Sequence, residues 1–438
     1  MTKELAIDTS PPDSQSPASG TNSASLPFLF LSFLKVGSTA FGGFMALISV
    51  VESIIVERRK LLQHEDMLDG ISLASVLPGP VAANVVAYVG YRLKGTMGAI
   101  ATATGVLLPS FILVLAFTIV YQNVGNIPEV TRVLMGFVPA VAAIILGAVW
   151  RMSKKALKGR VEVVVAVVAT AVMFAIQFLL KSPFSGFASA IRPYIPLLLV
   201  IVSGVFGWAY FHKPTETSSE SAAIASPPPV VQHSSKFKLA LTVGLLAGLL
   251  SCYLYKLQNP AFLGEDSLAT LFTTFSGMSI MLFGGGFVFI PIIQGVVVDS
   301  LGWVNNEQFT TAIAIGQITP GPILISAAFI GYVVKGFLGS LVSTIAIFFP
   351  PALIMVTCSH WLEQIKQSAV IQAALRGIRP AVIGMIFFAV YAVLTTAQLH
   401  WATPVIFAGA LIALVRFKVG LVVLIPVSGI LGLALYSL

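Results

Sequence analysis

Charged residues are scarce in this chain. Only 10% of its residues are Asp, Glu, Lys or Arg, whereas 57% are hydrophobic and the mean hydropathy is +0.95. Soluble domains carry roughly a quarter charged residues, so this composition excludes an ordinary soluble protein. Apolar runs of about twenty residues recur from Leu26 onward, without the alternation typical of barrel strands. The sequence therefore predicts an all-α polytopic membrane protein.

Reactive and metal-binding residues are also few. The two cysteines, Cys252 and Cys358, both lie in apolar segments, which argues against a disulfide framework or a zinc site. The chain has five histidines, and "QHED" at 63–66 lacks the second histidine of a zinc protease motif. Neither a Gly-x-Ser-x-Gly motif nor an ATP-binding phosphate loop is present. We therefore expect no enzyme activity, no cofactor, no metal and no use of ATP.

Two polar segments divide the chain. Residues 1–25 are rich in Ser and Pro and lack the features of a signal peptide, which predicts a disordered cytoplasmic tail. A polar linker at 212–238 separates a first transporter repeat (26–211) from a linking transmembrane helix (239–257) and a second repeat (258–438). About thirteen transmembrane segments are expected, at 26–50, 70–91, 95–121, 131–150, 161–180, 193–211, 239–257, 268–298, 309–334, 336–361, 376–398, 401–415 and 418–437. Re-entry of the segments that hold Pro-Gly-Pro is the alternative, and it would change this count by one or two.

Loop cations suggest the orientation. With the N-terminus in the cytoplasm and every segment crossing once, fifteen Lys and Arg residues fall in inner loops and eight in outer loops. This bias favours a cytoplasmic N-terminus and a C-terminus on the outer side. The "ERRK" cluster at 57–60 falls on the outer side, against the trend. The net charge of +8 reflects these loops, so we expect contact with the lipid bilayer and no nucleic acid.

The chain contains an internal repeat. Phe-Gly-Gly at 41–43 and at 283–285 are 242 residues apart, and so are Pro-Gly-Pro at 78–80 and at 320–322. After one gap, "GYRLKG" (90–95) matches "GYVVKG" (331–336) at an offset of 241. Seven expected helices separate matched positions, and an odd number reverses the orientation. The sequence thus predicts two inverted-topology repeats with interrupted helices, a pattern of secondary transporters.

Each Pro-Gly-Pro is expected to end one half-helix and begin another. The new N-terminus exposes unpaired N–H groups and carries about half a positive charge, so an anion is its natural ligand. We expect the two ends to meet near the membrane midplane. A simple kink is the alternative for each motif, and close helix packing is the alternative for the Phe-Gly-Gly glycines. The candidate substrate-binding residues are Lys35, Gly42, Gly43, Pro78, Gly79, Pro80, Asn84, Gly284, Gly285, Gln317, Thr319, Pro320, Gly321 and Pro322.

Lys35 makes the expected site asymmetric. It lies about nine residues into the first segment, roughly 13 Å deep, and its matched residue is Gly277. Snorkelling to the surface is the alternative. Two helix ends and Lys35 together give about +2, which suits a small dianion. Asp69 and Glu307 are the candidates for proton coupling, although capping or contact with water would also explain them.

The chain resembles the chromate ion transporter family in its long, two-domain form. The resemblance rests on "FLKVGSTAFGG", "LPGP", "GYRLKG", "FGGGFVFIPIIQGVVVDSLGWVNNEQF", "AIGQITPGP" and "FIGYVVKG". It implies an inner-membrane carrier that exports chromate with proton or potential coupling, and hence chromate resistance. Phe44 stands where the family usually has proline, and "MALIS" contains no histidine, which leaves sulfate or a related oxyanion open. Homo-oligomerisation is also open.

Overall fold

The computed structural model of the chain is helical throughout the part it describes, namely residues 25–40, 44–125, 127–179, 195–211, 235–259, 264, 267–282, 289–362, 368–395, 397 and 400–437. Of these residues, 88% are helical and none forms a strand. Five helical stretches in this part are long and apolar enough to cross a bilayer: Val81–Val124, Pro128–Lys154, Arg160–Leu179, Ile323–Trp361 and Ala369–Leu394. The chain is therefore an all-α, multi-pass membrane protein.

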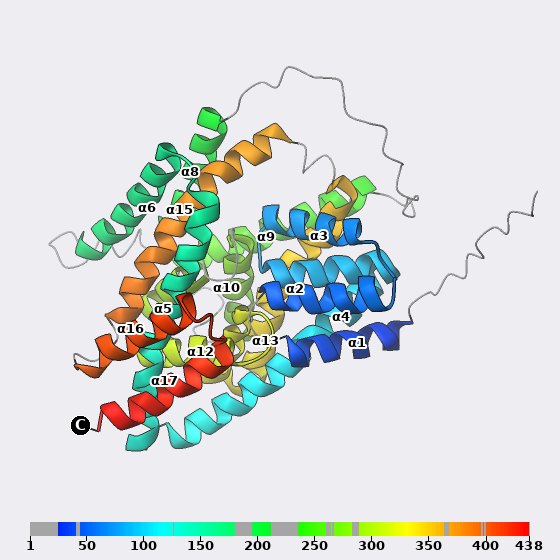
Figure 1. Ribbon diagram of the computed structural model, residues 1–438. Coiled ribbons are helices and arrows are strands. Elements are labelled where there is room, and N and C mark those ends of the chain that lie inside the picture. The colour runs from blue at the N-terminus through cyan, green and yellow to red at the C-terminus, as the bar shows by residue number, and fades with distance from the viewer. Residues whose placement is uncertain are drawn as a thin grey trace, which may run out of the picture.

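Two groups of helices face each other in Figure 1, with α12 between them. One group holds the elements α1 (Leu26–Thr39), α2 (Phe44–Glu52), η1 (Ser53–Arg58), α3 (His64–Val76), α4 (Val81–Val124), α9 (Ser235–Gln258), α10 (Leu268–Ile280) and α13 (Ser326–Cys358). The other holds α5 (Pro128–Ala156), α6 (Arg160–Leu179), α8 (Ile195–Phe211), α15 (Ala369–Leu394), α16 (Ala402–Val415) and α17 (Leu421–Leu435). The remaining elements are α11 (Phe289–Gln294), η4 (Gly295–Ser300), α12 (Asn306–Ile318), η5 (Ile323–Ile325) and η6 (Ser359–Trp361).

The first apolar segment folds back on itself. Helix α2, continued by the π-helix η1, runs back beside helix α1. The guanidinium of Arg59, at the end of η1, lies 5.1 Å from the ring centre of Phe28, at the start of α1. The two ends of the segment therefore lie together, with α1 ending at Thr39 and α2 beginning at Phe44. Gly42, Gly43, Gly284 and Gly285 lie outside the described residues.

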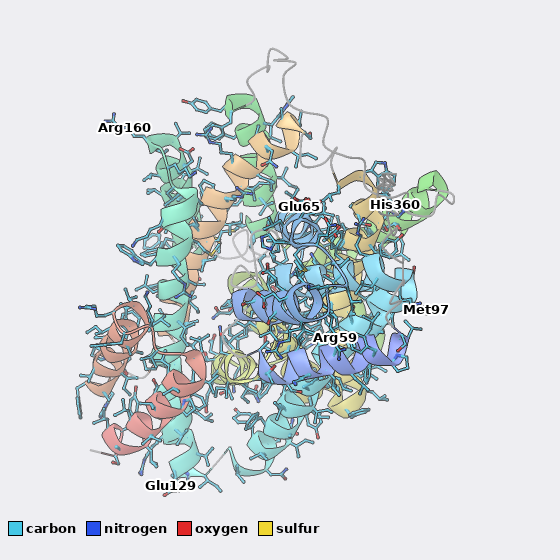
Figure 2. All side chains as sticks on the ribbon, turned by 45° about the vertical axis from the view of Figure 1, so that its right-hand side comes forward. Arg59, Glu65, Met97, Glu129, Arg160 and His360 are labelled. Carbon is cyan, nitrogen blue, oxygen red and sulfur yellow. The ribbon has the colours of Figure 1, made fainter. Side chains whose placement is uncertain are left out.

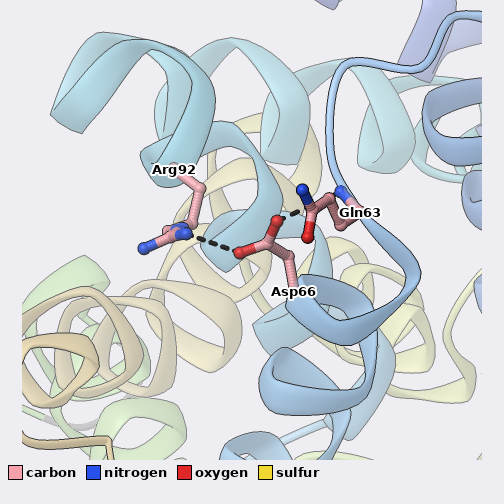
Figure 3. A network of polar contacts seen from close by, with 3 residues as sticks. All are labelled: Gln63, Asp66 and Arg92. Carbon is pink, nitrogen blue, oxygen red and sulfur yellow. Dashed lines mark hydrogen bonds and ion pairs between the residues drawn. The ribbon is translucent and has the colours of Figure 1, made fainter. Parts of the chain in front are cut away.

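The segment that holds the first Pro-Gly-Pro is also a hairpin. Near its open end, Arg92 Nη2 lies 2.5 Å from Asp66 Oδ1, and Asp66 Oδ2 accepts a bond from the Gln63 N–H (Figure 3). Closer to the turn, α3 and α4 approach so tightly that a Cβ on Gly70 would lie 2.6 Å from the Tyr88 ring. The pairs 66/92 and 70/88 are each centred on residue 79. Pro-Gly-Pro is thus the tip of a helical hairpin.

Helix α4 is itself divided into two arms. Lys94 and Gly95 leave the helical conformation, with φ/ψ of −145/28° and 60/−152°. The arms at 81–93 and 96–124 then pack antiparallel, as a 3.0 Å hydrogen bond from Thr102 Oγ1 to the Val86 carbonyl shows. Lys335 and Gly336 repeat this break in α13 with φ/ψ of −141/29° and 59/−148°. The second arm of α4 is about 43 Å long and can cross a membrane alone.

The duplication is visible in single backbone hydrogen bonds. Leu61 N–H donates a 2.8 Å hydrogen bond to Ile55 O. At the matching residues, 242 positions later, Trp303 N–H donates a 2.8 Å hydrogen bond to Val297 O. The π-helices η1 and η4 share this offset. So do Lys60 and Gly302, with φ of 50° and 61°. The two repeats therefore build their hairpins in the same way.

The repeats interlock through their later helices. Helix α5 of the first repeat packs against α16 and α17 of the second, while α15 of the second packs against α6 and α8 of the first. Glycines allow close approach at matched places: a Cβ on Gly136 would lie 2.9 Å from Gly432 Cα, and one on Gly377 would lie 2.7 Å from Gly207 Cα. Each repeat thus supplies the packing partners of the other.

The ends of these interlocked helices differ in chemistry. Glu162 is 3% exposed, and its Oε1 accepts bonds from Arg376 Nε at 3.0 Å and Nη2 at 2.9 Å. The same guanidinium lies 4.3 Å from the ring centre of Phe211. At the other end, Thr403 and Tyr436 share a hydroxyl–hydroxyl hydrogen bond of 2.7 Å. One end has a buried ion pair between the two repeats, and the other has a neutral hydrogen bond within the second repeat.

The hairpins change the expected path of the chain. The segment 26–50 was expected to cross the membrane once, and 70–91 to cross or to be re-entrant, whereas the structure gives each two antiparallel halves. An apolar hairpin and an apolar crossing have the same hydropathy, so the segment list could not separate them. Figure 2 shows where this path leaves the helix ends: Glu129 lies at the bottom, and Arg160, Glu65 and His360 lie toward the top.

Candidate anion site at the Pro-Gly-Pro turns

Both Pro-Gly-Pro turns are buried inside the protein. Gly79 and Gly321 have φ of +102° and +111°, a conformation that favours glycine. All six residues of the two motifs are buried. Helix α3 ends at Val76 and α4 begins at Val81, so the first turn joins two helix ends as the sequence predicts. In the second turn a short 3₁₀ segment, η5, precedes α13.

Each turn docks on the other repeat. Gly79 N–H donates a 2.6 Å hydrogen bond to the carbonyl of Leu282, which directly precedes the second Phe-Gly-Gly. Gly321 N–H donates a 3.2 Å bond to the carbonyl of Ala40, which directly precedes the first. Residues 40 and 282 match each other in the repeat, as do 79 and 321. Such reciprocal contacts are typical of a two-fold arrangement.

A second pair of contacts is reciprocal as well. A Cβ on Gly79 would overlap the Pro351 ring, and a Cβ on Gly321 would overlap the Ser110 hydroxyl. Residues 110 and 351 match at the offset of 241. Ser110 also donates a hydrogen bond to the Pro320 carbonyl. It lies near the middle of the second arm of α4, so the turns meet that arm about halfway along its length.

The turns offer hydrogen-bond donors. The first intrahelical bond of α4 runs from Asn84 N–H to the Pro80 carbonyl at 3.0 Å, so the N–H groups of residues 81–83 have no acceptor within the helix. Asn84 is fully buried, and its Nδ2 donates 3.0 Å to the Pro78 carbonyl. The N–H groups of Gly79 and Gly321 are used between the repeats. The free donors therefore lie just after the turns.

Unpaired polar atoms gather near the turns. Five buried side-chain polar atoms of the described residues have no hydrogen-bond partner, and three of these belong to Asn84, Gln317 and Ser326. Ser326 lies against Gly316, the neighbour of Gln317, because a Cβ on Gly316 would be 3.3 Å from Ser326 Cβ. An unpaired buried donor costs about 1–3 kcal/mol. Gln317 Nε2 and Ser326 Oγ are thus suited to a ligand that accepts hydrogen bonds.

The other candidate residues of the described part lie at different distances from the turns. Thr319 is buried just before the second turn, and its hydroxyl donates 3.2 Å to the Gly316 carbonyl. Lys35 is exposed on α1 and lines a cavity with Arg58 rather than a turn. Asp69 in α3 is about 15 Å along its helix from Gly79, and the exposed Glu307 begins α12, about 20 Å from Gly321. These two carboxylates are not brought together with the turns.

Sequence reasoning missed the docking partners of the turns, Ala40, Leu282, Ser110 and Pro351. The register of the repeat could have indicated them, because residues 40 and 282 match, and so do 110 and 351. Nothing in a single sequence says that matched residues cross-contact. Ser326, in contrast, is a hydroxyl donor that sequence reasoning does place near the second turn, and it occupies the position that matches Asn84.

Comparison with known proteins identifies the family. The sequence profile of the chromate transporter family matches residues 28–208 and 269–433. A chromate transport protein of Cupriavidus metallidurans is 26% identical over 94% of this chain and 93% of its own. An uncharacterised transporter of Methanocaldococcus jannaschii is 29% identical, with 83% of each chain covered.

A shorter relative matches only part of the chain. An uncharacterised transporter of Bacillus subtilis is 28% identical over 34% of this chain and 85% of its own, about the extent of one repeat. No solved structure matches. The profile covers both repeats, and we conclude that the chain belongs to the chromate transporter family.

Proposed function

We propose that this protein is a secondary transporter that exports chromate across the cytoplasmic membrane and so confers chromate resistance. The observation that carries the proposal is the pair of buried Pro-Gly-Pro turns, with unpaired donors on Gln317 and Ser326 beside them. Two helix N-termini give about one positive charge, and chromate accepts hydrogen bonds at four oxygens. The family and its named chromate transport proteins support the substrate.

The hairpins sharpen the proposed orientation. A hairpin returns the chain to the side from which it entered, so residues 57–60 move to the same side as Arg92 and Lys94. With the N-terminus in the cytoplasm, eighteen loop cations then face the cytoplasm and five face outward. The inner set is Arg58, Arg59, Lys60, Arg92, Lys94, Arg151, Lys154, Lys155, Lys158, Arg160, Lys213, Lys236, Lys238, Lys366, Arg376, Arg379, Arg416 and Lys418. The outer set is Arg132, Lys181, Arg192, Lys256 and Lys335.

The same path keeps the two repeats inverted. We count membrane crossings between a residue of the first repeat and its match in the second. The two hairpins add no crossing, and α6 and α8 together add an even number. The second arm of α4, α5 and α9 add one crossing each, so the total is odd. Opposite orientation of the halves therefore follows without the thirteen crossings first expected. Inverted repeats with broken helices at the midplane are typical of alternating-access carriers.

Movement of the chain is required for transport. Because both turns are buried, an anion reaches them only when one repeat shifts against the other. We propose rocking of the repeats about the docked turns, which opens the site to each side in turn. An inside-negative potential of 100 mV favours outward movement of a dianion by about 4–5 kcal/mol. Export can therefore run without a coupling ion.

The test uses the unpaired donors. Gln317→Leu and Ser326→Ala each remove a buried donor that has no protein partner, so we expect thermal stability to stay or rise by up to about 1–3 kcal/mol. Chromate uptake into inside-out vesicles with a lumen-positive potential should fall, because the anion loses that bond. Sulfate is run beside chromate to rank the two.

Ser340→Ala is the matched control. Ser340 Oγ is also buried and unpaired but lies on the second arm of α13, about 16 Å along the helix from Pro351. It should gain stability without losing transport. Wild-type chromate uptake by both donor variants would overturn the site, and a wild type that carries no chromate would overturn the function.

A further inference from the structure

A cavity of about 290 Å³ lies against the first hairpin. Its polar lining consists of Lys35 and Thr39 on α1, with Ser49, Ser53 and Arg58 on α2 and η1. The lining therefore contains two cations, three hydroxyl groups and no carboxylate. The site at the turns does not use these groups.

Neither cation is neutralised by the protein. Among the described residues, no ion pair involves Lys35 or Arg58, and the hairpin carboxylate of Glu52 pairs instead with His64 Nδ1 at 2.5 Å. The hydroxyls of Ser49 and Ser53 make no hydrogen bond to another described side chain or backbone group. The cavity thus combines two positive charges with two uncommitted hydroxyl donors, which is the complement of a tetrahedral dianion.

The π-helix η1 brings Arg58 to this cavity. In a π-helix the hydrogen bond joins residues i and i+5, so Ser53 and Arg58 lie on nearly the same face. In an α-helix, residues five apart would point about 140° away from each other. Helix α2 alone, continued regularly, would therefore turn the guanidinium away from Lys35. π-turns of this kind are frequent at functional sites.

The second repeat lacks this chemistry although its hairpin has the same backbone. Gly277, Gly295 and Ser300 occupy the positions that match Lys35, Ser53 and Arg58. The matching face of the second hairpin borders a cavity of about 110 Å³ that includes Asp299 and no Lys or Arg. Only one end of the duplicated site is positively charged.

We propose that the cavity at Lys35 and Arg58 is a loading site, where a tetrahedral dianion binds from the cytoplasm before it reaches the turns. The proposal rests on the proposed function and its orientation. Thr39 in the lining adjoins Ala40, whose carbonyl holds Gly321. Lys35 is five residues from that contact, about 8 Å along the helix, so the cavity lies next to the second turn.

Cysteine protection tests the loading site. In a background of Cys252→Ala and Cys358→Ala, Ser49→Cys should react with a membrane-impermeant thiol reagent in inside-out vesicles. Sulfate at ten times its dissociation constant should slow the reaction about tenfold, and chloride should not. Sulfate is the probe because chromate oxidises thiols. K35Q with R58Q should remove the protection, and K35R should keep it.

Two controls separate position and ligand source. Ser300→Cys, at the position that matches Arg58, should react from the opposite side without protection by sulfate. Phosphatidylcholine and phosphatidylglycerol proteoliposomes distinguish a free anion from a lipid headgroup. Protection by phosphatidylglycerol alone, with no further effect of sulfate, would overturn the loading site in favour of a lipid contact.

A turn variant separates this proposal from the proposed function. Asn84→Ala should lower chromate transport while Ser49→Cys stays protected by sulfate. Transport by the cysteine-free protein without any protection would overturn the loading site and leave the function standing. Protection of Ser49→Cys by sulfate in a protein that transports no chromate would overturn the proposed function and leave the anion-binding cavity standing.

Discussion

At the scale of single residues, the two turn glycines have equivalent backbones but different neighbours. Gly79 faces the ring of Pro351, which is fixed to its backbone, whereas Gly321 faces the hydroxyl of Ser110, which can rotate. Both glycines have φ above +100°, so any side chain is strained there by about 1–2 kcal/mol. Overlap with neighbouring atoms adds to the free-energy cost of a side chain at these positions, and this added cost differs between the repeats.

Gly79→Ala should therefore destabilise the protein more than Gly321→Ala. Overlap with a rigid ring adds about 1–3 kcal/mol to the backbone strain, whereas the Ser110 hydroxyl can move at the cost of its bond to the Pro320 carbonyl. Apparent melting temperatures in detergent measure the difference. Equal losses in the two variants would contradict the asymmetry, and Gly409→Ala, where a Cβ meets open space, is the control for substitution itself.

The sequence predicted much at this scale. Pro-Gly-Pro was recognised as a break that needs glycine, and the structure gives Gly79 and Gly321 positive φ. Asn84 was named beside the turn, and it closes that turn through the Pro78 carbonyl. The partners Leu282 and Ala40 were not predicted, because a contact across more than 200 residues depends on packing, and the register of the repeat does not say that matched residues contact each other.

At the scale of elements, the hairpins decide the topology. An apolar stretch of about 25 residues can cross a bilayer or turn back halfway, and its hydropathy is the same in both cases. The signal that pointed to the hairpins was "ERRK" at 57–60, which falls on the outer side when every segment crosses. Contacts between Arg59 and Phe28 and between Arg92 and Asp66 close both hairpins at their open ends.

Glu65→Cys should therefore react with an impermeant thiol reagent from the cytoplasmic side. Glu65 and Glu129 are both exposed, and they lie at opposite ends of the molecule in Figure 2. Glu129→Cys, in the same cysteine-free background, should react only from the other side. Labelling of both positions from one side would show that 26–50 crosses the membrane instead of turning back.

At the scale of the whole molecule, the two repeats complete each other. Helix α5 is covered by α16 and α17, and α15 by α6 and α8, so the main packing partners of each of these helices belong to the other repeat. The tight glycine contacts at Gly136 and Gly377 both cross between the repeats. These contacts predict that the two repeats hold together without the polar linker expected at 212–238.

Two chains cut within 213–234 should assemble when they are produced together. Each half alone would expose the buried faces of α5 or α15 and should be degraded or aggregate. Co-purification of the halves, with chromate transport restored, is the expected result. A stable and monodisperse single half would contradict the interlocked arrangement, and the intact chain produced in parallel is the control for expression.

In the proposed alternating-access cycle, the unequal ends of the molecule decide which of the two open states is favoured. If the two repeats were identical, the state open to the cytoplasm and the state open to the outside would have equal energy when no voltage is applied. The hairpins of the two repeats share one backbone conformation, which favours equal energies of the two states. Their side chains differ, which makes the energies unequal. Glu162 with Arg376 ties one end by charge, whereas Thr403 with Tyr436 ties the other by neutral hydroxyls. Of these two contacts, only the ion pair joins the two repeats. It must break if that end opens in the proposed rocking cycle, so the two open states differ in energy even when no substrate is present.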